Sequence, residues 1–112
     1  MSKPNLYLYK IQPVRPDMLT EGTSSQEERA ITAHFEYLKG LTSRGVVLLA
    51  GRTLNTDESS FGIVIFSTGS EDEARKIMED DPAVSGGVFS AEVYPYGLAL
   101  VGEAIMDWTR GR

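Results

Sequence analysis

The chain has 112 residues, no cysteine and a formal net charge of −5 at pH 7. We expect one domain, because this length and a 41% apolar content suit one folded core. The acidic balance argues against nucleic acid or an anionic membrane as partner, since both favour a basic patch. No apolar run is long enough to span a bilayer, and no signal peptide is evident. Together with the absence of cysteine, this predicts a cytoplasmic protein.

The first half of the chain predicts a strand, a loop and a long helix. Residues 5–12 are rich in Leu, Tyr and Ile and are followed by a proline, which is typical of a strand. Residues 14–22 contain proline and glycine and predict a long loop. A helix then begins at a cap formed by Ser24 or Ser25, with a glutamate three residues later, and ends near Arg44, before a glycine.

The second half predicts a hairpin, a second helix and a last strand. Residues 46–52 and 61–67 are apolar and flank a polar, turn-like segment, so we expect two strands in a hairpin. A helix follows from residue 70, and a fourth strand covers 88–94 with an extension towards residue 100. The order β-α-β-β-α-β is a split βαβ pattern and predicts an α+β fold with a core at about residues 5–98.

The tail, residues 101–112, is harder to interpret from its pattern. A short helix is one possibility. We expect Trp108 in this tail to pack on some other surface, because a large aromatic side chain favours burial.

The second predicted helix has a sharply defined end. Ser70 and Glu73 fit a capping box at its start. Pro82 lacks an N–H group and restricts Asp81 to an extended conformation, and Gly86 lies just beyond. We therefore expect the Asp81 carboxylate to be held at a fixed position, where it is either a site residue or only a helix cap or turn residue.

Three of the predicted strands carry apolar residues on both faces. Two helices can cover only one face of a four-stranded sheet, so we expect a second copy of the chain to cover the other and form a homodimer. In the first strand, alternation places Leu6 and Leu8 on one face and Tyr7, Tyr9 and Ile11 on the other. In the second, it places Val46, Leu48 and Ala50 on one face and Val47 and Leu49 on the other. In the third, it places Phe61, Ile63 and Ile65 on one face and Val64 and Phe66 on the other.

His34 is the only histidine, and it lies on the apolar stripe of the first helix with Ile31, Leu38 and Leu41. A histidine on such a stripe is often a core residue with one satisfied hydrogen bond. In a split βαβ fold, however, the two helices lie side by side and antiparallel, so His34 can approach Asp81. A carboxylate that holds an imidazole fixes its tautomer and raises its basicity. The pair is therefore a candidate for acid–base catalysis.

Arg52 ends the second predicted strand and has two possible roles. It can bind an anionic substrate, or it can pair with Asp57 or Glu58 in the following loop. The sequence has no phosphate-binding or dinucleotide-binding motif and no metal-ligand spacing, so we expect neither a cofactor nor a metal.

Three segments together resemble the YCII (YciI-like) family: HFEYLKGLTSRGVVLLAG from His34, the hairpin strand FGIVIFS, and EDEARKIMEDDPAVSGGVFSAEVYP, which contains Asp81. The resemblance spans about Tyr7 to Pro95. It implies a ferredoxin-like, dimeric α/β barrel in which His34 and Asp81 match the histidine and aspartate of the family's active site. The wider superfamily includes isomerases, dehalogenating lyases and cofactor-free oxygenases that act on small ring compounds.

Two positions depart from the family pattern. Many relatives have an arginine where this chain has Ile31, and a proline where it has Arg52. The predicted pocket therefore differs from that of many relatives, so no relative's substrate is carried over.

Two functions remain open at this point. The first is a small cofactor-independent enzyme in which His34 is general base or acid, Asp81 orients it and Arg52 binds an anionic or enolate oxygen. Its substrate would be a small ring-type or anionic metabolite that undergoes proton abstraction, isomerisation or elimination. The alternative is a dimeric module that binds a small ligand without turnover, in which His34 only packs or hydrogen-bonds.

Overall fold

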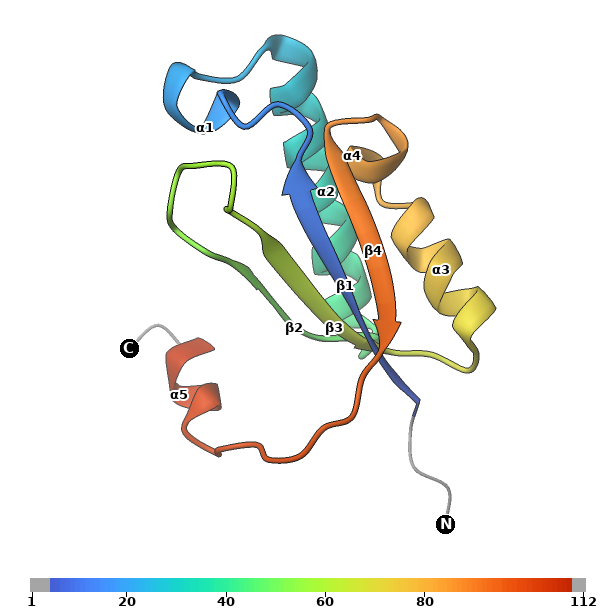
Figure 1. The fold of residues 1–112 in the computed structure, drawn as a ribbon. Helices are drawn as coiled ribbons and strands as arrows, with labels where there is room; N and C mark the ends of the chain where they lie inside the picture. The colour runs from blue at the N-terminus through green and yellow to red at the C-terminus, as the bar shows by residue number, and fades with distance from the viewer. Residues whose placement is uncertain (1–4, 110–112) are drawn as a thin grey trace.

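The computed structural model describes residues 5–109 as a four-stranded antiparallel sheet with helices (Figure 1). The strand order is β2-β3-β1-β4, which confirms the predicted α+β ferredoxin-like fold. Within the described residues, none of the helices has the length and apolar character needed to cross a membrane. The elements are β1 (Leu6–Pro13), α1 (Met18–Glu21), α2 (Ser25–Ser43), β2 (Val47–Arg52), β3 (Gly62–Ser67), α3 (Glu71–Glu79), α4 (Pro82–Ser85), β4 (Phe89–Pro95) and α5 (Ile105–Thr109).

The two long helices begin at the predicted serine caps. Ser24 caps α2 in a complete capping box with Glu27, which satisfies backbone N–H groups that the helix cannot use. The helix ends before Gly45, whose φ of 78° suits glycine better than any other residue. Ser70 caps α3 by accepting from the Glu73 N–H, while the Glu73 carboxylate accepts from the Ser70 hydroxyl.

Two local predictions were wrong. The predicted loop contains α1, in which the buried Met18 side chain anchors the turn. The fourth strand stops at Pro95 instead of continuing towards residue 100, and its pairing with β1 ends with the bond from the Tyr96 N–H to the Leu6 carbonyl. Trp108, in α5, is 74% exposed in the single chain, so its packing on another surface stays a prediction. The prediction for the tail at residues 110–112 lies outside the described residues.

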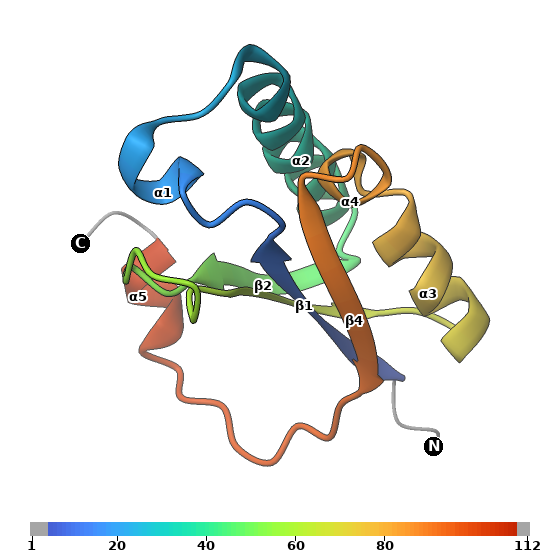
Figure 2. The same cartoon turned by 45° about the horizontal axis from the view of Figure 1, so that its top comes forward.

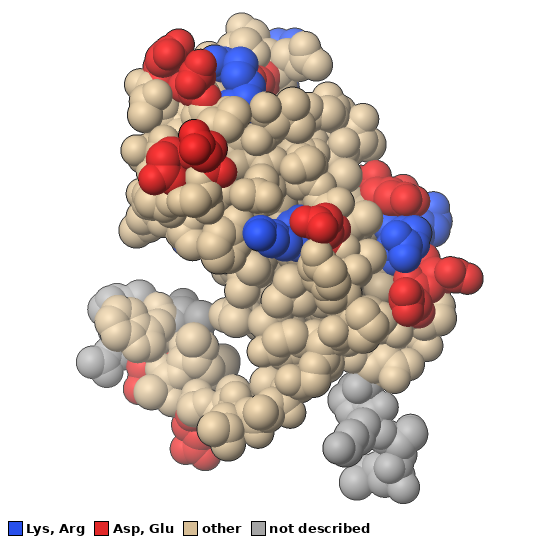
Figure 3. All heavy atoms as spheres, viewed as in Figure 1, with Lys and Arg blue, Asp and Glu red and all other residues tan. Residues whose placement is uncertain are grey.

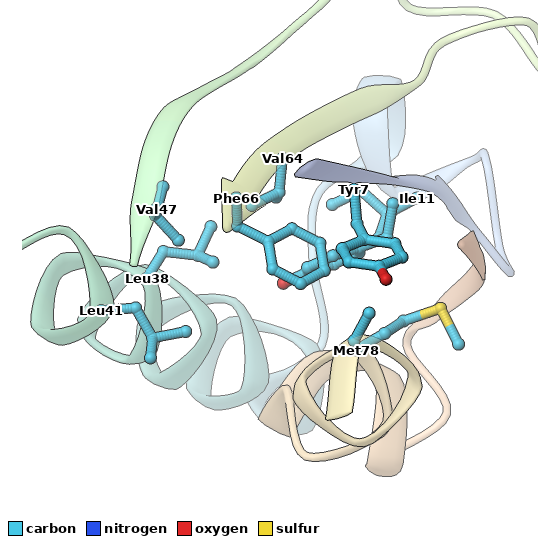
Figure 4. Close-up of a cluster of buried hydrophobic side chains, with 10 residues drawn as sticks. Tyr7, Ile11, Leu38, Leu41, Val47, Val64, Phe66 and Met78 are labelled. Carbon is cyan, nitrogen blue, oxygen red and sulfur yellow. The ribbon is translucent and has the colours of Figure 1, made fainter. Parts of the chain in front are cut away.

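The core lies between the sheet and the helices α2, α3 and α4, which all cover one face (Figure 2). From β1, the side chains of Tyr7, Tyr9 and Ile11 point into it, as the alternation predicts. Phe66 of β3 packs edge-on against Tyr9, and Leu38 of α2 closes the cluster (Figure 4). Because this cluster contains side chains from both the sheet and the helices, it fixes the distance and the orientation of α2 relative to the sheet.

A β-bulge in β2 changes which face its residues occupy. Val47 pairs with Phe66, but the next partner of Ile65 is Leu49, so the register shifts between Val47 and Leu49. A bulge inserts one extra residue and inverts the alternation beyond it. The simple alternation predicted for this strand was therefore wrong, and Arg52 lies on the helix-covered face instead of the open one.

The open face of the sheet is largely uncharged. Paired residues form an apolar row across all four strands, from Leu49 through Ile65 and Leu8 to Tyr94. Figure 3 looks onto this face and shows a positive and a negative side chain side by side near its middle, with other charged side chains towards its borders. In the sheet register, Lys10 pairs with Glu92 on this face. Leu49 is 39% exposed and Tyr94 is 45% exposed, so the chain alone does not bury this row.

Candidate functional site

Asp81 is the most buried polar side chain among the described residues, with 0% exposure. Its φ of −60° and ψ of 122° are extended, as Pro82 predicts. Asp81 also caps α4, because its Oδ1 accepts from the Ala83 N–H at 3.0 Å. The alternative of a helix cap is thus correct as well, and capping one helix leaves the second carboxylate oxygen free for another role.

That second oxygen holds His34. The distance between His34 Nδ1 and Asp81 Oδ2 is 2.6 Å, so the predicted contact between the two helices is present. The edge of the imidazole meets the Phe89 ring, with 5.3 Å between ring centroids. The His34 side chain is only 13% exposed. It is therefore held on one side by a charge and on another by an aromatic ring.

The hydrogen-bond pattern determines where the proton sits on the neutral imidazole. An ionised Asp81 can only accept, and it receives bonds from the Ala83 N–H and from the Tyr9 hydroxyl at 2.7 Å. The third partner, His34 Nδ1, must then be a donor. The remaining ring nitrogen, Nε2, is left with a free lone pair. This is the protonation state that a general base needs.

Tyr9 is the site residue that sequence reasoning missed. It is fully buried on β1, and its hydroxyl donates to the same Asp81 oxygen that holds His34. Burial and the neighbouring carboxylate raise the pKa of Tyr9 far above its ordinary value. The signal available in the sequence was a tyrosine on the core face of a central strand, since a buried phenol needs a polar partner.

Tyr9→Phe is expected to alter the stability of the protein in alkali. The folded chain keeps the Tyr9 proton above pH 10 while the unfolded chain loses it, so stability falls as pH rises beyond that value. One such group steepens the fall by about 1.4 kcal/mol per pH unit. Urea unfolding between about pH 10 and pH 11.5 should show a shallower fall in the variant. Parallel curves for the two proteins would contradict this assignment.

His34 lies in the wall of a cavity of about 630 Å³ between α2 and the β2–β3 hairpin. Most of this wall is apolar, including Ile31, Leu38 and Phe89. The volume suits a small organic molecule. Nδ1 of His34 faces Asp81, so Nε2 and its free lone pair lie on the edge of the ring that points away from the carboxylate.

The charged residues of this cavity wall are Lys39 and Arg52, with no aspartate or glutamate among its described residues. This is notable in a chain of net charge −5. The β2 bulge contributes directly, because it turns Arg52 towards the helix-covered face. The cavity therefore favours an anionic ligand over a cationic one.

The alternative role predicted for Arg52, an ion pair with Asp57 or Glu58, is not seen among the described residues. The Asp57 carboxylate accepts from Asn55 and Ser59 within its own loop, and these bonds lower the pKa of Asp57. Within residues 5–109, neither Asp57 nor Glu58 forms an ion pair with Arg52. The guanidinium is thus available to a ligand. No group of three or more metal-ligating side chains occurs in the described part of the chain.

Comparison with known families places this site in context. The model of the YCII-related domain matches residues 8–96, which is most of the chain and includes His34, Arg52 and Asp81. The chain belongs to the YCII-related family. A search of curated proteins finds no significant match to this YCII-related protein.

Two solved structures are similar to this YCII-related protein. The first is 5-chloro-2-hydroxyhydroquinone dehydrochlorinase (TftG) from Burkholderia phenoliruptrix AC1100 in complex with 2,5-dihydroxybenzoquinone. It is 25% identical with a TM-score of 0.62, over 84% of this chain and 95% of the other. The second is an uncharacterized protein from Thermotoga maritima, with 13% identity, a TM-score of 0.53 and coverage of 86% and 100%. The second likeness concerns the fold alone.

The two positions expected to depart from the family pattern both line the cavity. Ile31 and Arg52 belong to its wall together with His34, whose contact with Asp81 is present beside them.

Proposed function

We propose that this YCII-related protein is a cofactor-independent enzyme that uses His34 for acid–base chemistry on a small anionic or ring-type metabolite. The observation that carries the proposal is the 2.6 Å contact between His34 Nδ1 and Asp81, in the wall of a largely apolar cavity. A non-catalytic binding module would be favoured by a His34 bonded only to backbone. The contact with a buried carboxylate supports the enzyme instead.

The proposed chemistry begins with proton removal. His34 Nε2 takes a proton from a substrate carbon next to a carbonyl, and the C–H electron pair forms an enolate. Arg52 stabilises the charge that develops on the enolate oxygen. Asp81 holds the imidazolium that results and keeps its orientation, without itself taking the proton. The imidazolium then returns the proton to another atom, which is an isomerisation, or a leaving group departs with its electron pair, which is an elimination.

The solved relative supports the class of ligand. TftG is named as a dehydrochlorinase of a chlorinated hydroxyhydroquinone, and its structure contains 2,5-dihydroxybenzoquinone. That ligand is a flat, acidic ring, and the cavity here combines apolar walls with Lys39 and Arg52. We therefore propose hydroxylated aromatic or quinone compounds as the substrate class.

Exchange of ring protons with deuterium tests the proposal directly. The protein is incubated with 2,5-dihydroxybenzoquinone in D₂O, and the loss of the ring C–H signal is followed by NMR. This exchange needs proton transfer to and from carbon, which is the step assigned to His34. We expect exchange well above the buffer rate. A rate equal to buffer for this compound and for its hydroxylated analogues would contradict the proposed chemistry.

We also propose a homodimer through the open face of the sheet. The apolar row from Leu49 to Tyr94 supports it, as does the exposed apolar tail. A stable interface of this kind buries about 1,500 Å² or more in total. Sedimentation at micromolar concentration should give twice the 12.3 kDa chain mass. Leu8→Glu, at the centre of the row, should give monomer, whereas a monomeric wild type would contradict the proposal.

A further inference from the structure

The cavity beside His34 continues into a second one. The second cavity has a volume of about 420 Å³ and lies under α1, where Met18 and Leu19 form part of its wall. The two cavities are adjacent because five residues line both: Ile11, Ile31, Arg52, Gly62 and Phe89. A ligand in the first cavity can therefore extend a substituent into the second.

Gly62 lies where the two cavities meet. In the sheet it pairs with Ile11 on one side and with Arg52 on the other, so these three residues form a row on the helix-covered face. A Cβ atom at position 62 would lie 3.1 Å from Ile11 Cγ1 and 3.2 Å from the Gly51 carbonyl oxygen. A side chain at this position would crowd Ile11 and the Gly51 backbone, so glycine lets β2 and β1 approach β3 closely where the two cavities meet.

The second cavity has hydroxyl groups in its wall, as the first has at Thr42 and Ser43. Thr56 and Ser60 line it with hydroxyl-bearing side chains, and Ser60 is only 4% exposed. Their loop is held in place by bonds from Asn55 and Ser59 to Asp57. The segment before α1 is tied to α2 by Arg15, which pairs with Glu27 at 2.7 Å and lowers the pKa of Glu27 to about 2. The hydroxyl groups therefore belong to an ordered wall.

The described residues that line the second cavity, like those of the first, include positive charge but no carboxylate. Arg52 is its only charged residue among the described ones that line it, and no carboxylate competes for the guanidinium there. A guanidinium next to hydroxyl groups suits a carboxylate, which accepts charge-assisted hydrogen bonds. It does not suit a second apolar ring or a cation.

We infer that the substrate has two parts: a hydroxylated ring beside His34 and a short side chain that ends in a carboxylate bound by Arg52, Thr56 and Ser60. This inference rests on the proposed function for the position of the ring. It adds the substituent, which the chemistry of the first cavity does not require.

Three probes separate the ring, the length of the side chain and its charge. Hydroquinone supplies the ring alone, 2,5-dihydroxyphenylacetate adds the carboxylate, and the methyl ester of that acid keeps the length but removes the charge. Affinities are measured by calorimetry for the wild type, for Arg52→Met and for Gly62→Ala. Arg44→Met serves as a matched control, since Arg44 is an arginine at the end of α2 that lines neither cavity.

For the wild type, we expect the acid to bind about tenfold more tightly than hydroquinone or the ester, from one added charge-assisted contact. Arg52→Met should remove this gain, so that the acid binds no more tightly than hydroquinone or the ester, and Gly62→Ala should weaken the acid more than hydroquinone. Arg44→Met should behave as the wild type. Retained hydroquinone binding also shows that a variant is folded.

Equal affinities for acid and ester, or an unchanged acid affinity in Arg52→Met, would overturn the two-part substrate. If hydroquinone binds and His34-dependent exchange is intact, that result leaves the proposed acid–base function standing. If none of the probes binds and no exchange occurs, both proposals fail.

Discussion

Asp81→Ala is expected to lower the free energy of unfolding by about 3–5 kcal/mol. The Asp81 carboxylate is fully buried and accepts from the Tyr9 hydroxyl, the Ala83 N–H and His34 Nδ1. Alanine leaves all three donors without this partner, and each buried donor left unpaired costs about 1–3 kcal/mol. Some of this cost is recovered where water reaches the new space beside His34. Since domains of this size are stable by about 5–15 kcal/mol, the loss is large.

Urea unfolding measures this loss, and the chain offers a close control. Asp80 precedes Asp81, but its carboxylate is half-exposed and pairs with Lys76 on the surface at 3.2 Å. Asp80→Ala should therefore cost no more than about 1 kcal/mol. Asp81→Asn keeps the shape and one acceptor oxygen, so its cost should fall between the two. Equal losses for Asp80→Ala and Asp81→Ala would show that the buried hydrogen bonds do not anchor this site.

His34→Gln is expected to slow the exchange of ring protons by about 10²–10⁴-fold, which is the usual contribution of a positioned acid–base group. Glutamine keeps a side-chain N–H that can donate to Asp81, so the fold should be retained. It cannot accept a proton near neutral pH, so the chemical step should fail. Ligand affinity should change much less than the exchange rate, since the apolar wall and Arg52 remain.

The control for this variant is Glu36, which lies two residues after His34 on α2. Glu36 is exposed and lines neither of the two cavities, so Glu36→Gln should exchange protons at the wild-type rate. Asp81→Asn should lower the rate as well, because an amide can donate to Nδ1 and favour the wrong tautomer. An exchange rate in His34→Gln that matches the wild type would remove His34 from the mechanism.

The contact between His34 and Asp81 could be predicted because it depends on few features of the sequence. The apolar stripe of α2 places His34 on the buried side, and Pro82 fixes the backbone at Asp81. The order of strands and helices then sets the two helices side by side (Figure 2). Each step follows from local patterns and one rule of topology.

The face of Arg52 could not be predicted, because it depends on a bulge. One extra residue near Leu48 inverts the alternation of β2, and nothing in the run VVLLAGR marks its position. The same bulge determines that Arg52 shares a cavity with His34. Tyr9 was missed for a different reason, since its burial was predicted but the partner of its hydroxyl depends on the three-dimensional position of Asp81.

Trp108 shows a further limit of arguments from a single chain. The expectation that it packs was sound as a rule for aromatic residues, yet 74% of it is exposed in this chain. Other apolar residues of the same tail, including Leu100 and Val101, are exposed as well. A second copy of the chain would supply the missing contacts under the proposed homodimer, and sequence patterns alone do not say which partner a side chain uses.

The protonation state of His34 tests the central claim most directly, and the chain makes the measurement simple because it contains one histidine. Long-range ¹H–¹⁵N correlation spectra of the labelled protein distinguish a protonated ring nitrogen from one with a free lone pair. In the neutral imidazole, we expect the proton on Nδ1 and a lone pair on Nε2, with this preference lost in Asp81→Asn. A proton on Nε2 in the wild type, or identical spectra for the wild type and Asp81→Asn, would contradict the account.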